Sequence, residues 1–291
     1  MAGIDLIAGP AAEPVSVSDM LTQLGFPDVT DATLLATLTT QLTDFITGAR
    51  ATCEDYCHRA FVTQTRLLRL DGWPVIRWRY NWAGYREINV PYSPLQSVIS
   101  VQYVDASGNV DTLTRDTSYG TSSLQYGYQL VRGNGLGCGK IQSAWARPWP
   151  PLRMVPDSVL IKYRCGYGGP VTGSMAVDSA VLTGPVFNPD DAPVMAGETG
   201  TAVSVPGAGT NGAALNTYVA AVDANGQATL AAPAVVAVDN ATVWTGEQVP
   251  PAIVRAIKFL AQFYYEQGSV VDQAIPRVVQ NLLQPYTNEV S

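Results

Sequence analysis

The chain is poor in charged residues. Of its 291 residues, only 14% are Asp, Glu, Lys or Arg, whereas a soluble domain carries about 25%. Hydrophobic residues make up 47%, which is enough to bury a sizeable core and excludes global disorder. So few charges would cover an isolated monomer poorly, and the composition therefore indicates a subunit with large protein contacts.

Four further features are missing from the sequence. The net charge of −7 argues against a basic face that binds nucleic acid. No apolar run approaches the roughly 18 residues that a membrane span needs, and residues 1–10 lack the basic and apolar regions of a signal peptide. The four cysteines are too few for a disulfide scaffold, so we expect reduced thiols in a cytoplasm.

The sequence contains a single histidine, His58, which any Ser/His/Asp or Cys/His mechanism would have to use. Cys53 and Cys57 are four residues apart on a predicted helix, so a metal could bridge them. A structural zinc site usually has four ligands at recognisable spacing, and the other cysteines, Cys138 and Cys165, form no Cys-x-x-Cys pair. We therefore expect packing residues here, with no metal and no cofactor.

A glycine-rich segment at 133–140 is similar to a phosphate-binding loop. A P-loop has glycine where this chain has Asn134, and Ser or Thr where it has Ile141. No helix is expected to follow, because the next residues, SAWARPWPP, contain helix-breaking prolines. The segment is predicted to be a turn beside a strand. With no other catalytic grouping, the chain is predicted not to be an enzyme.

Tryptophans and arginines are interleaved in two parts of the chain, at 73–86 and 145–153. Aromatic and arginine side chains together can bind single-stranded nucleic acid by stacking. They are also enriched in protein interfaces. Outside the acidic segment between Arg164 and Arg255 the chain has no net charge, so we expect a protein interface.

All of the net charge lies in one segment. Between Arg164 and Arg255 there is no Lys or Arg but there are seven acidic residues, which leaves 17 acidic and 17 basic residues elsewhere. The composition changes to Ala, Val, Gly, Thr and Pro, with short β-favouring runs separated by turn signals. This pattern predicts a small β-domain at 171–247, inserted between 1–170 and 248–291. A solvated low-complexity linker is the alternative.

Helices are predicted at both ends of the chain. Apolar residues recur every three or four positions in 31–59, and a capped helix is expected at 16–25. Two more are expected at 251–268 and 275–285, each with proline near its first turn. Between 61 and 166 the period changes to two, which is typical of strands. The predicted fold class is α+β, with a helical core of two N-terminal and two C-terminal helices, a β-rich middle and an inserted small all-β domain.

The order of these motifs resembles a known family. PVSVSDM near the start and a long helix ending in ITGARATCEDYCHRAFVTQTRLLRLDGWP are similar to the head–tail connector (adaptor) proteins of tailed phages and gene transfer agents. The VPYSPLQSVISVQYVD hairpin, the SVLIKYRCGYG strand, and the segments VPPAIVRAIKFLAQFYYEQG and IPRVVQNLLQPY are similar too. The resemblance covers 1–166 and 248–287. The insert departs from it and looks like a β-module of other phage structural proteins.

The resemblance implies a non-enzymatic structural protein of the virion neck, assembled in the host cytoplasm. Such adaptors form a homo-oligomeric ring, a dodecamer, that docks under the portal protein. The ring extends the channel through which double-stranded DNA passes during genome ejection, without sequence-specific binding and without a membrane partner. It presents a platform to the next neck or tail completion protein.

The resemblance also implies where the partners bind. A C-terminal tail would contact the portal, and its candidate residues are Pro285, Tyr286, Thr287, Asn288, Glu289, Val290 and Ser291. The late helix is apolar nearly all round, so it must be buried in its own core or against a neighbouring copy. The candidate ring-interface residues are Ile253, Ile257, Leu260, Phe263, Tyr264, Trp78 and Trp82.

A second function class stays open beside the adaptor. It is a phage decoration or tail-attachment protein whose β-insert binds another virion protein or a host glycan. Stoichiometry separates the two, because an adaptor closes a ring on the portal and a decoration protein follows capsid symmetry. In the ring, the acidic insert is expected at the outer rim, since many copies close to the channel would repel one another.

Overall fold

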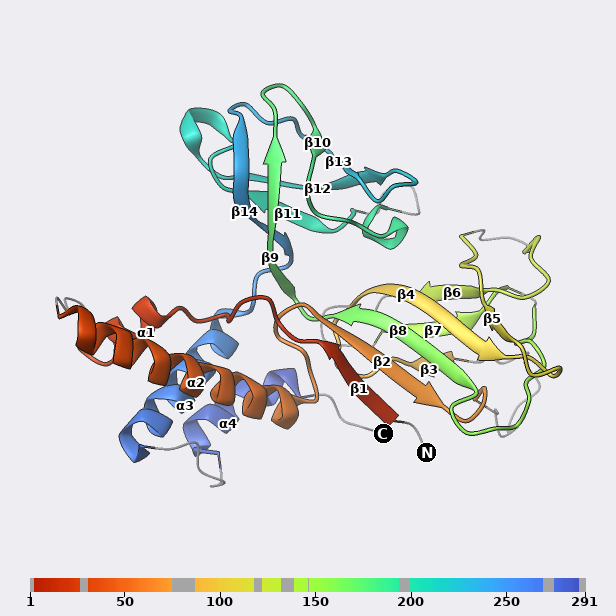
Figure 1. Ribbon diagram of the computed structural model, residues 1–291, viewed down its shortest axis with the longest axis horizontal. Coiled ribbons are helices and arrows are strands. Elements are labelled where there is room, and N and C mark those ends of the chain that lie inside the picture. The colour runs from red at the N-terminus through yellow and green to blue at the C-terminus, as the bar shows by residue number, and fades with distance from the viewer. Residues whose placement is uncertain are drawn as a thin grey trace.

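The computed structural model describes residues 3–26, 31–74, 87–117, 122–131, 139–145, 147–193, 199–268 and 275–287 (Figure 1). Within these residues, α-helices lie on one side of a β-rich body, and a second group of strands stands above both in the view of Figure 1. The helices are α1 (Val17–Gln23), α2 (Ala32–Cys57), α3 (Pro251–Gln267) and α4 (Arg277–Leu283), and the short 3-10 turns are η1 (Pro189–Asp191), η2 (Thr210–Gly212) and η3 (Gln284–Tyr286).

Local signals explain where the helices begin and end. The Oγ of Ser16 accepts a hydrogen bond from a backbone N–H of the first turn of α1 at 3.1 Å. A carboxylate oxygen of Asp31 accepts two such bonds at the start of α2, at 2.8 and 3.1 Å. Both are N-cap contacts. α2 ends at His58 and α3 at Gly268, each in the left-handed conformation that closes a helix.

The helices form one hydrophobic core between segments far apart in the sequence. α2 packs against α3, and α3 packs against α4. Their apolar stripes face inward because residues three and four apart share a helix face. The fully buried side chains in this helical core include Leu42 and Ile46 from α2, Ile257 and Leu260 from α3, and Leu283 from α4.

The β-rich body contains a five-stranded and a three-stranded antiparallel sheet. The larger sheet has the order β1-β2-β8-β4-β5, and the smaller has the order β3-β7-β6. Val101 and Ile161 of the larger sheet share one core with Ile141 of the smaller. The strands are β1 (Gly3–Ala8), β2 (Gln64–Leu70), β3 (Glu87–Asn89), β4 (Leu95–Val104), β5 (Val110–Thr112), β6 (Tyr128–Val131), β7 (Lys140–Ser143) and β8 (Val159–Cys165).

A six-stranded antiparallel sheet with the order β10-β13-β12-β11-β14-β9 forms the third part. Ser174 in β9 and Thr183, just after β10, exchange backbone hydrogen bonds of 2.9 and 3.0 Å. These bonds join the two ends of the sheet, so the six strands close into a barrel with its own core. The strands are β9 (Gly168–Met175), β10 (Val181–Leu182), β11 (Ala202–Val205), β12 (Leu215–Val222), β13 (Ala228–Leu230) and β14 (Val238–Gly246).

The predicted fold class is wrong. The chain is rich in sheet rather than built on a helical core, because strands form two of the three hydrophobic cores among the described residues. The four helices of the described residues supply only the remaining core. The prediction gave too much weight to the long apolar stripe of α2, and it missed β1, which pairs with β2 at the edge of the larger sheet.

The ends of the acidic segment lie side by side. Gly168 at the start of β9 pairs with Gly246 at the end of β14. A Cβ at either glycine would collide with the backbone opposite, and Gly246 has a φ of +92°, so the close approach depends on glycine. This arrangement suits a unit inserted into a loop. We keep the division into 171–247 and a parent domain of 1–170 with 248–291 as a proposal.

Excising the barrel is expected to leave the rest of the chain folded. Residues 172–242 would be replaced by Asn-Gly, which favours a tight hairpin turn, between Val171 and Val243, which pair across β9 and β14. This cut retains Trp244, which packs on the helical core and which a wider cut of 172–246 would remove. Urea unfolding should show a single cooperative transition. A soluble product without such a transition, or an insoluble one, would refute the proposed division.

Candidate functional site

The residues that catalysis or a metal site would need do not converge in the described part of the chain. No group of three or more His, Cys, Asp or Glu residues there is placed to hold a metal ion. Cys53 and Cys57 are fully buried in the helical core, and burial raises the pKa of the Cys57 thiol to about 12. His58 is exposed at the end of α2, and Cys138 lies outside the described residues. Among the described helices, none is long and apolar enough to cross a bilayer.

Most of the predicted ring-interface residues face the interior of their own chain. Ile253, Ile257, Leu260 and Tyr264 are each at most 3% exposed, in the packing of α3 against its neighbours. Their burial leaves almost no surface for another copy, so their placement does not support an interface role. Phe263 is half-buried against the same core. Trp78 and Trp82 lie outside the described residues.

Two other tryptophans of the Trp- and Arg-containing segments 73–86 and 145–153 have a structural role. The rings of Trp73 and Trp149 are stacked, with their centroids 4.4 Å apart and their planes 9° apart. The indole N–H of Trp73 donates to the carbonyl oxygen of Pro150 at 2.9 Å. These contacts connect the end of β2 to the segment before β8. They leave Trp145, which is 45% exposed, as the described tryptophan most available to a partner.

The predicted portal-binding tail divides into two parts. Pro285 and Tyr286 belong to the 3-10 turn η3, and the ring of Tyr286 packs against the helical core. Thr287 donates a hydrogen bond from its hydroxyl to the carbonyl oxygen of Gln284 at 2.8 Å. Asn288, Glu289, Val290 and Ser291 lie outside the described residues.

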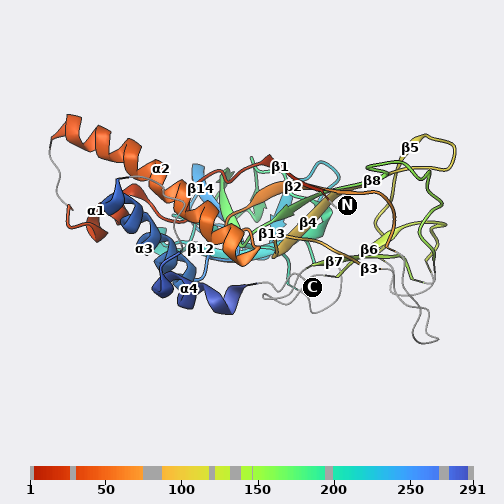
Figure 2. The ribbon, with the colours of Figure 1, turned by 90° about the horizontal axis from the view of Figure 1, so that it is seen from below.

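Exposed apolar side chains gather at the start of α2, where the sequence analysis did not place an interface. Leu34 is 50% and Leu35 37% exposed, and Phe26 after α1 is 44% exposed. Figure 2 shows the first turns of α2 extending beyond the other helices. Residues 32–43 contain no charged residue, and this absence was the signal in the sequence, since interface cores are depleted in charge.

A second exposed apolar stretch lies on β1. Ile4, Leu6 and Ile7 are 38%, 54% and 50% exposed. β1 is an edge strand, paired only with β2 among the described strands. Unpaired backbone groups on such an edge can accept a further strand. The start of α2 and the free edge of β1 are therefore two apolar surfaces on different elements of one protomer.

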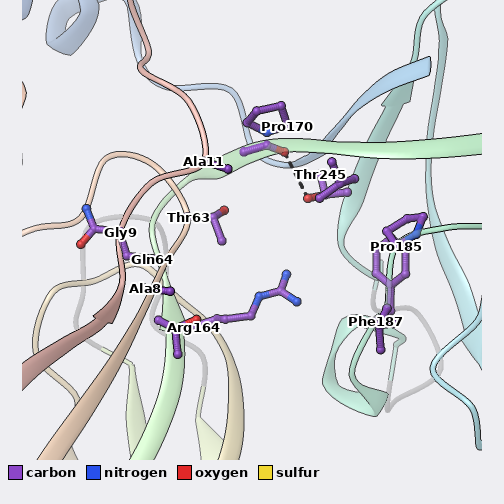
Figure 3. Close-up of a pocket in the computed structure, with 14 residues that line it drawn as sticks. Ala8, Gly9, Ala11, Thr63, Gln64, Arg164, Pro170, Pro185, Phe187 and Thr245 are labelled. Carbon is purple, nitrogen blue, oxygen red and sulfur yellow. Dashed lines mark hydrogen bonds between the residues drawn. The ribbon is translucent and has the colours of Figure 1, made fainter. Parts of the chain in front are cut away.

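A half-open hollow of about 200 Å³ lies where the barrel meets the larger sheet (Figure 3). Its walls come from the end of β1, the start of β2, the first residues of β9 and the segment 185–187. Arg164 of β8 extends its guanidinium into this space. Most of the other lining residues are apolar or small, including Ala8, Val171 and Phe187.

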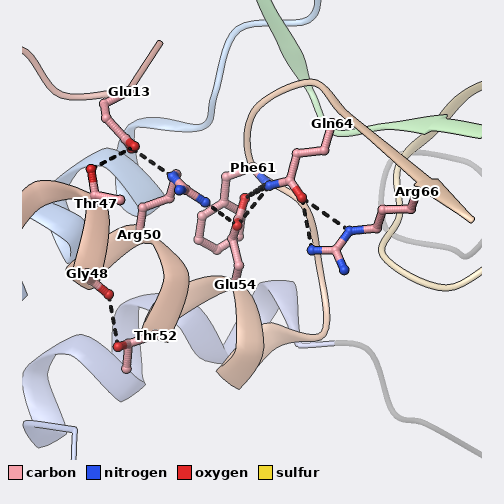
Figure 4. Close-up of polar contacts among 9 residues, drawn as sticks. All are labelled: Glu13, Thr47, Gly48, Arg50, Thr52, Glu54, Phe61, Gln64 and Arg66. Carbon is pink, nitrogen blue, oxygen red and sulfur yellow. Dashed lines mark hydrogen bonds and ion pairs between the residues drawn. The ribbon is translucent and has the colours of Figure 1, made fainter. Parts of the chain in front are cut away.

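A buried polar network connects the helices to the larger sheet (Figure 4). The carboxylate of Glu54 in α2 accepts hydrogen bonds from the Arg50 guanidinium at 2.5 Å, from the backbone N–H of Phe61 at 2.6 Å and from the Gln64 amide at 2.8 and 2.9 Å. Arg50 also donates to Glu13 at 2.7 Å. Burial raises the pKa of Glu54 despite the neighbouring arginine. The network holds the segment before α1, the helix α2 and the strand β2 in fixed relation.

Comparisons with known proteins identify a shared fold and no family. No protein-family model and no curated protein sequence matches the chain. Among solved structures, a chain in the virion of a native gene transfer agent (GTA) particle is similar, with 16% identity and a TM-score of 0.50. Chains in the neck of an empty GTA particle computed with C6 symmetry (14% identity, TM-score 0.49) and in the neck of a native GTA particle computed with C12 symmetry (15%, 0.47) are also similar.

The first of these likenesses extends over the whole length of both proteins. It covers 99% of this chain and 97% of the chain in the virion. The helices, the sheets and the barrel therefore all lie within the aligned part. The chain has the fold of a gene transfer agent virion protein over nearly its full length.

Proposed function

We propose that this chain is a non-enzymatic structural protein of a virion neck, an adaptor whose ring docks on the portal, extends the DNA channel and joins head to tail. The observation that carries the proposal is the fold shared with a chain of a gene transfer agent virion across 99% of this chain. The sequence resemblance to head–tail connectors supports it independently, because it rests on motifs and their order.

The distribution of apolar surface supports assembly into a ring. The start of α2 and the edge of β1 expose apolar residues on different elements, so neither surface satisfies the other within one protomer. When one surface of a copy contacts a different surface of the next, the association is head-to-tail, and it closes into a ring if the rotation permits. The scarcity of charge suits a subunit whose surface is largely covered by neighbours.

The distribution of charge supports a conduit for DNA rather than a DNA-binding site. The parent domain has no net charge, and all seven net negative charges lie in the barrel segment. Phosphates are repelled by acidic protein and are not retained by a neutral wall. Barrels at the outer rim would also be farther apart than a Debye length of about 10 Å, which relieves their mutual repulsion.

Native mass spectrometry of the protein mixed with its portal tests the proposal. We expect about twelve copies per portal ring, by analogy with the adaptor family that the sequence resembles, arranged as a closed cyclic assembly. Leu34→Asp with Leu35→Asp should prevent ring closure, because it places charges on the exposed start of α2. The matched control, Val110→Asp on a hairpin residue that is 68% exposed, should assemble normally. One or two copies per portal, or copies that follow capsid symmetry instead, would overturn the proposal.

A further inference from the structure

The hollow between the barrel and the larger sheet contains an arginine whose donors are poorly used. Arg164 approaches Asp191 with Nη1 3.8 Å from Oδ2, which is beyond hydrogen-bonding distance. Its Nη2 lies 3.4 Å from the Gln96 side-chain oxygen, at the long limit for such a bond. The Nε is buried and has no hydrogen-bond partner among the described residues.

Asp191 forms a long ion pair with Arg164, but its oxygens accept their hydrogen bonds from the barrel. Its Oδ2 accepts from the backbone N–H of Asn188 at 2.8 Å, and its Oδ1 accepts from the Thr201 hydroxyl at 3.0 Å. Asp191 is completely buried, whereas the Arg164 side chain is 18% exposed toward the hollow. Because the Nε is buried, an acceptor that enters the hollow would meet the end of the guanidinium, whose present contacts are long.

We propose that this hollow binds a carboxylate carried by an apolar polypeptide segment of a partner protein. A guanidinium offers parallel N–H donors that match the two oxygens of a carboxylate. The apolar walls suit the small hydrophobic groups next to such a carboxylate, and Val186 at the rim is 74% exposed. The acceptor is either an Asp or Glu side chain within the partner or the partner's C-terminal carboxylate.

The size and charge of the hollow select against other ligands. A drug-sized ligand or metabolite usually fills about 300–1,000 Å³, whereas this space holds about 200 Å³. A phosphate carries about two negative charges and a carboxylate carries one, so the acidic barrel, which forms one wall, repels a phosphate more strongly. A single carboxylate with a short apolar neighbour fits both limits.

Nuclear magnetic resonance of the full chain with small probes tests the proposal. N-acetylvaline imitates a chain terminus, and N-acetylglutamate α-methylamide imitates an acidic side chain. N-acetylvaline methylamide has the same apolar body as the first probe without the carboxylate. We expect at least one carboxylate probe to shift the Arg164 Nε–H resonance and the methyl resonances of Val171 and Val186, with a dissociation constant on the order of 1 mM. The stronger of the two probes identifies the source of the carboxylate.

Three variants separate binding from folding. Arg164→Gln should weaken binding at least tenfold, whereas Arg153→Gln, which changes an exposed arginine beside the β4–β5 hairpin, should bind as the unchanged chain does. Ala8→Phe should block the hollow while Arg164 remains, and Ala8 is exposed, so this variant is expected to fold. Equal binding of the methylamide, or binding that survives both Arg164→Gln and Ala8→Phe, would overturn the proposal. The ring test with the portal does not depend on this result.

Discussion

Replacing Glu54 with alanine should lower the free energy of unfolding by about 3–5 kcal/mol, the usual loss when one partner of a buried ion pair is removed. The carboxylate is the common acceptor for Arg50, the Phe61 backbone N–H and the Gln64 amide. Glu54 is only 3% exposed, so water cannot easily replace its carboxylate. Its removal leaves the Phe61 N–H and the Gln64 amide buried without an acceptor. Urea denaturation measures the loss.

Two further variants make this result specific. Asp55→Ala changes the adjacent, exposed carboxylate of α2 and should alter stability by less than about 0.5 kcal/mol. Glu54→Gln keeps an acceptor for the Phe61 N–H and removes a buried charge, while Arg50 retains Glu13. It should therefore cost less than half as much as alanine. Equal losses of stability for Glu54→Ala and Glu54→Gln would show that the hydrogen bonds accepted by this side chain do not contribute to stability.

The pH dependence of stability, compared between the unchanged chain and Glu54→Gln, tests whether burial raises the pKa of Glu54. Burial raises the pKa of Glu54 above its ordinary value of 4.5, so the folded state holds this proton more tightly than the unfolded state. Its contribution to stability is present below pH 4.5 and is lost as the pH rises through the raised pKa. The stability of the unchanged chain relative to Glu54→Gln should therefore fall over that range. A relative stability that increases with pH would contradict this assignment.

Truncation after Thr287 should abolish docking on the portal and leave the fold intact. Pro285 and Tyr286 are already held within the chain, in η3 and against the helical core. The proposed adaptor role therefore assigns docking to the last four residues, 288–291. Co-sedimentation with the portal should lose nearly all of the bound protein, while the urea unfolding midpoint stays unchanged.

A matched control for the truncation distinguishes the role of residues 288–291 in docking from the role of Tyr286 in packing. Tyr286→Ala keeps residues 288–291 and removes a partly buried aromatic ring, so it should lower stability by about 1–3 kcal/mol and still dock. Removal of 285–291 should show both effects together. Normal docking by the shorter truncation would disprove the role of the tail.

Local signals in the sequence predicted the helices well. They did not predict the pairing of strands that are far apart in the sequence. Ser16 and Asp31 were recognisable caps, and the apolar spacing between 31 and 59 marked the longest helix. β1 was missed because six residues, partly apolar and partly polar, have little pattern of their own. Their strand conformation depends on pairing with β2, more than 55 residues later. Fold class depends on such distant pairings, which is why its prediction failed.

The candidate surfaces show the same limit. An apolar helix such as α3 has to be buried, but its sequence does not distinguish its own core from a neighbouring copy. The structure places α2 and α4 over it, so the interface assignment of Ile253 and Ile257 loses its support. The hollow at Arg164 was not predictable either. Its walls come from β1, β2 and the barrel, and no local pattern brings these together.

The hydrogen bonds between Ser174 and Thr183 have a consequence for how the protein behaves when many copies are close together. An open sheet of this composition, rich in Val, Ala and Thr, would present unpaired strands that favour edge-to-edge aggregation. Joining β9 to β10 removes the two edges of this sheet, and seven negative charges without a Lys or Arg would make neighbouring barrels repel one another in the proposed ring. In the proposed ring, the closed barrel would therefore allow many β-rich copies to lie close together without polymerising.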